Sequence, residues 1–163
     1  MILPMTLISA IFALAVSLSV EAATIYGRVV GITDGDTITV LDARNQQHKI
    51  RLAGIDAPEK TQAFGPASKM NLSTLVFGRE VTLDCGKTDR YRREICVVVV
   101  AGKDANRAQV AAGMAWWYRQ YQREQTALQR TAYEAAEASA RAGRIGLWQD
   151  ADPVAPWMWR RKK

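Results

Sequence analysis

Histidine and cysteine are scarce in this chain of 163 residues, which has one histidine, His48, and two cysteines, Cys85 and Cys96. A structural zinc site takes four nitrogen or sulfur ligands, a set that these side chains do not fill, so zinc is not expected. The chain also lacks internal repeats, low-complexity stretches and any break in composition that would mark a second domain. Its length therefore indicates one domain with a real core.

Negative charge is in the minority, with 16 acidic residues against 22 lysines and arginines. The formal net charge is +6 and the isoelectric point is about 9.6. A basic surface attracts polyanions, either nucleic acids or anionic lipids, and charge alone does not choose between them.

Charge is almost absent from the first 22 residues, where Glu21 is the only charged side chain. Residues 7–20 form an apolar run of secretory-signal length, and Val20 and Ala22 place small residues at −3 and −1 of a cleavage site. The run is shorter than the about 20 apolar residues of a membrane span. We therefore predict that residues 1–22 are a signal peptide and that the protein is secreted or periplasmic. The alternative is an uncleaved amino-terminal anchor.

The two cysteines flank a predicted hairpin loop. Cys85 follows the strand-like residues 80–84, and Cys96 precedes the apolar run 97–100. If these strands pair in an oxidising compartment, the two sulfurs can form a disulfide across them. Otherwise both cysteines remain reduced, partly buried thiols.

The first part of the chain is rich in residues that favour strands. Asp34-Gly35 is a strong hairpin turn signal between the first two strands. In the third strand Ile50 and Leu52 lie on one face, which we expect to face the core, so Arg51 points to the other face, away from the core. The predicted strands are residues 24–33, 37–41, 47–52, 80–84 and 95–101.

Helices are expected at three places. Residues 66–77 begin at a proline and end at Gly78, residues 105–112 have Asp104 as N-cap, and residues 125–142 end at Gly143. The first is expected to turn Met70, Leu72, Leu75 and Val76 towards the core. The last is expected to carry its apolar side at Leu128, Ala132, Ala135, Ala136 and Ser139.

Five short strands with a helix between the third and fourth follow the order of an OB-fold. We predict a mainly β plus α protein, a five-stranded OB-fold barrel with three helices packed on it, over residues 23–150. Residues 151–163 form an aromatic and basic tail. Either the tail adds a phosphate contact, or Trp157 and Trp159 pack on the domain and the basic end is solvated.

Three short runs carry the chemistry. They are Asp34-Gly35-Asp36-Thr37, Ile55-Asp56-Ala57-Pro58-Glu59 and Asp89-Arg90-Tyr91-Arg92-Arg93, with Arg51 four residues before the second. Taken alone, the first two runs are also ordinary turns, because Asp, Gly and Pro favour turns. Together they supply carboxylates for a hard cation and for a water proton, and guanidinium groups for a phosphate. In order and spacing they closely resemble the thermonuclease family, from about Thr24 to Trp148.

The resemblance implies a calcium site. Asp36 and Asp56 would bind Ca²⁺ through their carboxylates, and Ala57 would bind it through its backbone carbonyl. The type member of the family has Thr at this last position, a difference that leaves a carbonyl ligand intact. Asp34 would add negative potential from behind. Water and a substrate phosphate oxygen would complete the oxygen-only sphere that calcium prefers.

The resemblance also assigns the catalytic groups. Glu59 would activate or orient the attacking water, and Arg51 and Arg93 would grip the phosphate as charge develops on its oxygens. Family members commonly have Gly where this chain has Arg92. A loop that needs positive φ there would be strained by Arg.

Further contacts would involve Arg90, Tyr91 and Tyr121, which match family positions around the bound nucleotide. Position 119 is Arg where the type member has a nucleotide-contacting Tyr. The implied activity is calcium-dependent endonucleolytic hydrolysis of DNA and RNA with little sequence specificity, leaving 3′-phosphates. No stable protein partner is implied, and a monomer is expected. The alternatives are a non-catalytic OB-fold nucleic-acid-binding module and a basic membrane-associated protein.

Overall fold

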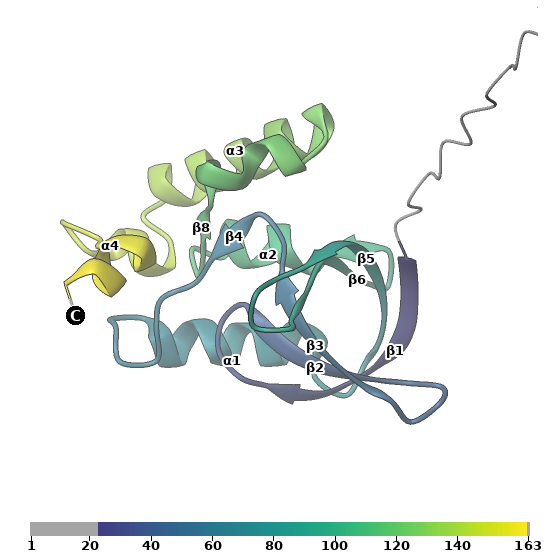
Figure 1. The fold of residues 1–163 in the computed structure, drawn as a ribbon. Coiled ribbons are helices and arrows are strands. Elements are labelled where there is room, and N and C mark those ends of the chain that lie inside the picture. The colour runs from purple at the N-terminus through teal and green to yellow at the C-terminus, as the bar shows by residue number, and fades with distance from the viewer. Residues whose placement is uncertain (1–22, 163) are drawn as a thin grey trace, which may run out of the picture.

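A closed barrel forms the centre of the computed structural model, which describes residues 23–162 (Figure 1). The predicted signal peptide, residues 1–22, lies outside the described residues. The strands are hydrogen-bonded in the order β3-β2-β1-β5-β6, and a parallel pairing of β3 with β6 closes the barrel. This confirms the predicted five-stranded OB-fold barrel. Its strands are β1 (Ala23–Ile32), β2 (Thr37–Asp42), β3 (Gln47–Leu52), β5 (Glu80–Thr88) and β6 (Glu94–Val100).

Alternation along the strands fills the barrel. Ile38 of β2 pairs with Ile50 of β3, and both side chains are fully buried. Leu52 points inward beside them, so Arg51 between Ile50 and Leu52 faces away from the core, as predicted. The same interior holds further branched side chains from the other strands: Val29, Val40, Val81, Leu83 and Val98.

A histidine between two carboxylates lies beside the seam where the barrel closes. The His48 ring of β3 contacts Asp42 of β2 through Nε2 at 3.1 Å and Glu94 of β6 through Nδ1 at 3.3 Å. Burial alone would lower the pKa of His48, but its hydrogen bonds to Asp42 and Glu94 and the attraction of both carboxylates raise it. Hydrogen bonds from the Gln46 amide and from His48 lower the pKa of Asp42.

These shifts predict a pH-dependent contribution of His48 to stability. A raised pKa in the fold means that the contribution is complete below the unfolded pKa of about 6.5 and is lost as pH rises through the folded pKa. We therefore expect His48→Gln to lower Tm more at about pH 5.5 than at about pH 8.5. Thermal unfolding of both proteins at the two pH values measures this. A Tm difference that does not change with pH would contradict the assignment.

Helices cover one side of the barrel, and short elements connect them (Figure 1). Helix α2 lies between the barrel and α3, and β4 pairs with β8 beside it. The fourth helix, α4, was not predicted and lies on the opposite side of the view from β1. The helices are α1 (Gly65–Val76), α2 (Ala105–Ala111), α3 (Ala127–Ala142) and α4 (Pro156–Arg161), with 3₁₀ turns η1 (Arg119–Glu124) and η2 (Gly146–Gln149). The short strands are β4 (Ile55–Asp56), β7 (Lys103–Asp104) and β8 (Trp116–Trp117).

Two predicted helix faces need correction. Met70 of α1 is exposed, while Leu72 and Val76 are fully buried and Leu75 packs against the core. In α3 the predicted apolar side is wrong at Leu128, Ala135 and Ser139, which are exposed, whereas Ala136 packs against the core as predicted. The buried side is instead Tyr133, Glu137 and Ala140.

The cause of the α3 error is a buried polar side chain. The Glu137 carboxylate accepts a hydrogen bond from the Trp117 amide at 3.1 Å and pairs with Arg119 at 2.7 Å. An apolar pattern cannot show such a residue, and its omission rotates the inferred face.

The two cysteines form a disulfide. Cys85 of β5 and Cys96 of β6 lie opposite each other in the strand pair. Of the two alternatives, the structure has the bridge. Among the residues that the structure describes, no helix is long and apolar enough to cross a membrane.

Candidate active site

A pocket of about 720 Å³ opens at the end of the barrel where the first two predicted runs meet. Its wall also includes residues of the third run, of η1 and of α4. All residues predicted to act on a cation or a phosphate line it: Asp36, Arg51, Asp56, Ala57, Glu59 and Arg93. The predicted nucleotide contacts line it as well: Arg90, Tyr91 and Tyr121.

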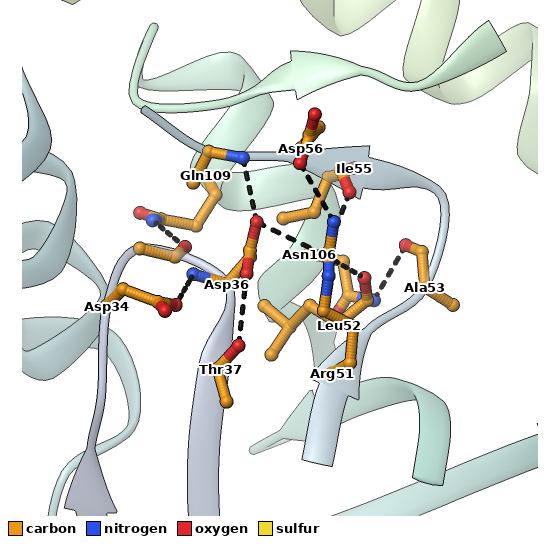
Figure 2. A network of polar contacts seen from close by, with 12 residues as sticks. Asp34, Asp36, Thr37, Arg51, Leu52, Ala53, Ile55, Asp56, Asn106 and Gln109 are labelled. Carbon is orange, nitrogen blue, oxygen red and sulfur yellow. Dashed lines mark hydrogen bonds and ion pairs between the residues drawn. The ribbon is translucent and has the colours of Figure 1, made fainter. Parts of the chain in front are cut away.

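Asp36 and Asp56 converge on one guanidinium group (Figure 2). Arg51 Nη1 lies 3.2 Å from Asp36 Oδ2, and Nη2 lies 3.0 Å from Asp56 Oδ1. Arg51 is itself held by hydrogen bonds to the carbonyl oxygens of Leu52, at 3.1 Å, and Ile55, at 2.9 Å. Two carboxylates 20 positions apart in the sequence therefore face the same point.

The loops that carry Asp36 and Asp56, here called the two acidic loops, also contact each other directly. The Ala57 amide donates to Asp36 Oδ2 at 2.8 Å, which ties the second run to the first. Gly35 allows this approach, since a Cβ atom there would lie 1.9 Å from Ser68 Oγ and 2.8 Å from the Ala57 Cβ. The hairpin turn thus needs glycine because of packing.

Two buried side chains of α2, neither of which was predicted to be functional, hold these loops in place. Gln109 donates to the Gly35 carbonyl at 2.7 Å, behind Asp34 and Asp36. Asn106 donates to the Ala53 carbonyl at 3.0 Å, in the loop after Arg51. The only available signal was two amide side chains on the core side of a short helix, which is also common without function.

Burial governs the protonation of the carboxylates. The Asp56 side chain is 2% exposed. Its burial raises its pKa to about 6, and the Asp36 charge adds to this, while Arg160 and Arg51 act in the opposite direction. Burial and the neighbouring Asp36 charge also raise the pKa of Asp34. Burying ionised carboxylates is unfavourable, and a bound cation would offset this unfavourable free energy, so the site is suited to a cation.

Glu59 lies at the mouth of the pocket, with its side chain 38% exposed. Its carboxylate contacts Arg160 of α4 at 2.7 Å. Arg160 was predicted only as part of a basic tail, and the structure places it in the pocket. No local sequence signal joins two residues 101 positions apart.

Arg93 lies on another wall of the pocket and is oriented by Asp89. Its Nε and Nη2 lie 2.8 and 2.7 Å from Asp89 Oδ2. Its Nη1 reaches Thr37 Oγ1 at 3.4 Å, and this hydroxyl donates to Asp36 Oδ1 at 3.1 Å. Burial acts to raise the pKa of Asp89. Hydrogen bonds from the amide and side chain of Arg93 and from the Tyr91 amide outweigh it, so the pKa of Asp89 is lowered. Arg93 is thus connected to Asp36 through the Thr37 hydroxyl.

The strain expected at Arg92 is present. Arg92 has φ 61°, in the left-handed region where an L side chain costs roughly 1–2 kcal/mol. The Arg92 side chain is exposed, whereas that of Arg93 is turned to the pocket.

Three tyrosine side chains, Tyr91, Tyr118 and Tyr121, also line the pocket. Tyr91 is 63% exposed and stacks with Arg90, and Tyr121 is 42% exposed and lies under Lys87. Tyr118, which was not predicted, lies edge to face with Tyr121. Arg119, at the position of a family tyrosine, instead pairs with Glu137. Exposed rings can stack on bases of any sequence.

The donor set fits a hard divalent cation. Asp36 and Asp56 supply carboxylate oxygens from two loops, Ala57 lines the same pocket, and the described residues of the pocket include no histidine or cysteine. Oxygen ligands of this kind suit calcium, magnesium or manganese rather than zinc or copper.

Comparison with known sequences agrees with this geometry. The sequence model of the family described as staphylococcal nuclease homologues matches residues 49–150. The chain is 46% identical over 136 residues to an uncharacterised endonuclease of Haemophilus influenzae, covering 83% of this chain and 73% of the relative. The chain belongs to the staphylococcal nuclease family. The predicted thermonuclease resemblance is thereby confirmed.

A second relative is similar over most of its length. Micrococcal nuclease of Shigella flexneri is 43% identical over 144 residues, covering 83% of this chain and 80% of the relative. The family consists of metal-dependent nucleases. The range matched by the family model contains Arg51, Asp56, Glu59 and Arg93, but Asp36 precedes it and Arg160 follows it.

Proposed function

We propose that this protein is a calcium-dependent endonuclease that hydrolyses phosphodiester bonds of DNA and RNA. The observation that carries the proposal is the convergence of Asp36 and Asp56 on Arg51, with Glu59 and Arg93 in the same pocket. A binding module needs basic and aromatic groups only, and gains nothing from buried carboxylates beside the phosphate path.

The groups of the pocket suit hydrolysis. Asp36, Asp56 and the Ala57 carbonyl would hold Ca²⁺, which when bound neutralises charge on a phosphate oxygen. Glu59 accepts the proton of a water molecule as the water oxygen attacks phosphorus. Arg51 and Arg93 donate to the phosphate oxygens that gain charge. The bond from phosphorus to the 5′-oxygen breaks, this oxygen takes up a proton, and the products carry a 3′-phosphate and a 5′-hydroxyl.

Sequence specificity should be low. The groups in the pocket are suited to phosphates and to the faces of bases, and neither carries much sequence information. We also propose that the protein acts outside the cytoplasm, which the predicted signal peptide and the disulfide between Cys85 and Cys96 support, and that it acts as a monomer.

A cleavage assay tests the proposal. Purified protein is incubated with plasmid DNA and with RNA, in calcium or in excess chelator, beside the Glu59→Ala variant. We expect both nucleic acids to be degraded with calcium, no degradation with chelator, and a loss of about 10²- to 10⁴-fold for Glu59→Ala. End-group analysis should find 3′-phosphates.

Other outcomes are equally informative. Nucleic acid that stays intact but migrates more slowly in a gel would identify a non-catalytic binding module. Degradation that persists in chelator, or that magnesium supports better than calcium, would contradict the proposed cofactor.

A further inference from the structure

The C-terminal helix α4 packs against residues beside the pocket. The Trp157 ring stacks on Tyr118, with 5.0 Å between ring centroids and an interplanar angle of 8°. Trp157 also meets Trp116 edge to face at 5.5 Å. Pro156, which starts the helix, is buried. Helix α4 is thus packed on the domain, and its side chains have set positions relative to the pocket.

One buried amide fixes both α4 and the loop of Glu59. Gln62, which is 6% exposed, donates to the Val154 carbonyl at 2.6 Å, just before α4. Its side-chain oxygen accepts a hydrogen bond from the Glu59 amide at 3.1 Å. The segment that leads into α4 and the backbone of Glu59 are therefore held at a fixed separation.

Arg160 extends from α4 and joins two carboxylates of the site. Its Nη1 and Nη2 donate to the two oxygens of Asp56, at 3.2 and 2.8 Å. Nη1 also donates to Glu59 Oε1 at 2.7 Å. Among residues 23–162, Arg160 is the only hydrogen-bond partner of the Glu59 carboxylate. Without this guanidinium, no hydrogen bond within the described residues would orient the Glu59 carboxylate, although Gln62 still holds the Glu59 backbone.

We propose that Arg160 is a positioning residue of the active site, which holds the Glu59 carboxylate in a set place relative to Asp56 during hydrolysis. This inference rests on the proposed function. A planar guanidinium can bind two carboxylates at once, whereas a lysine offers a point charge. An ionised carboxylate has about four acceptor positions, so Asp56 can keep Arg160 and still bind a cation.

The next residue provides a matched control. Arg161 has the same charge, lies on the same helix and is exposed. Within the described part of the chain, Arg161 makes no ion pair, and it does not line the pocket. If basic charge only helps to bind nucleic acid, replacing Arg160 or Arg161 should have similar effects. If Arg160 orients Glu59, only the replacement of Arg160 should affect catalysis.

Steady-state kinetics on the full-length protein test the proposal. At saturating calcium, we expect Arg160→Gln to lower kcat about 10- to 100-fold while KM changes less than about threefold. Arg160→Lys should recover only part of the loss, and Arg161→Gln should stay within about twofold of the wild type. An unchanged kcat in Arg160→Gln, or a rise in KM alone, overturns the proposal.

A double-mutant cycle asks whether Arg160 acts through Glu59. In a Glu59→Gln background, Arg160→Gln should add less than about twofold to the loss of kcat. Losses that multiply would mean that Arg160 acts independently and would overturn the proposal. Circular dichroism of each variant verifies the fold, and Arg160→Lys supplies the cycle if Arg160→Gln does not fold.

Two measurements do not depend on cleavage. In the cation-free protein, the Tm losses of Arg160→Gln and Glu59→Gln should be less than additive, and additive losses overturn the pairing. Calorimetric titration with calcium asks whether Arg160 competes with the cation. Calcium bound more than about tenfold tighter by Arg160→Gln, with kcat undiminished, would also overturn the proposal. A wild-type protein that cleaves nothing refutes the proposed function, while the Tm cycle still tests the pairing.

Discussion

Replacing Arg93 with alanine is expected to lower kcat for phosphodiester cleavage about 10³-fold. The Arg93 guanidinium is held by Asp89 at 2.7 Å and lies on the pocket wall near Thr37. It can donate to a phosphate as negative charge accumulates on the equatorial oxygens. Its loss therefore removes stabilisation of the transition state more than of bound substrate. Kinetics on a defined oligonucleotide, with kcat and KM separated, measure the effect.

Arg92 is the matched control, since it has the same charge one residue earlier and is exposed. We expect Arg92→Ala to change kcat less than about threefold and to reduce the slope of log affinity against log salt by about one. If Arg92→Ala costs more activity than Arg93→Ala, the assignment of the catalytic arginine is shifted by one residue.

Replacing Asp56 with asparagine should abolish activity yet leave the cation-free protein at least as stable. The first effect follows from the loss of a proposed calcium ligand, and about 10³-fold or more is expected. The second follows from burial, which raises the Asp56 pKa to about 6 even with Arg51 and Arg160 beside it. A neutral side chain avoids this cost, so a gain of roughly 1–3 kcal/mol at neutral pH is expected.

The arginines are not left unpaired in this variant. Arg160 keeps Glu59 at 2.7 Å, and Arg51 keeps Asp36 and the carbonyls of Leu52 and Ile55. This is why the usual large penalty for removing one partner of a buried ion pair should not apply.

The pH dependence has a definite sign. An acid whose pKa is raised in the fold loses stability as pH rises from the unfolded pKa, near 3.8, through about 6. The Tm advantage of Asp56→Asn should therefore be absent at about pH 4 and complete above about pH 7. Unfolding scans of both proteins across this range measure it. A large loss of stability at neutral pH would show that the guanidinium groups need the Asp56 charge.

The barrel was predictable because its signals are local. Residues 38–41 and 48–52 alternate between buried and more exposed side chains, so this periodicity and the turn residues located β2 and β3 to within a residue. Asp104 was predicted to be the N-cap of α2, and its carboxylate accepts a hydrogen bond from the Arg107 amide at 2.9 Å. Such features depend on residues a few positions apart.

Helix faces were less predictable where polar groups are buried. Glu137 is 1% exposed because the Trp117 amide and Arg119 satisfy its oxygens, and neither partner is near it in sequence. Tyr133 is buried with its hydroxyl bonded to Asp104 at 2.8 Å. Both contacts exist only once α3 has packed.

The sequence by itself determined the barrel, the three acidic and basic runs and their resemblance to the nuclease family. These depend on residue type and on short spacing, which a single chain displays directly. Only the tertiary structure decided that Asn106 and Gln109 brace the acidic loops and that Arg160 reaches Asp56, which lies 104 positions earlier. Contacts at such separations are set by how α2 and α4 pack on the barrel, and packing depends on the whole fold rather than on any local pattern.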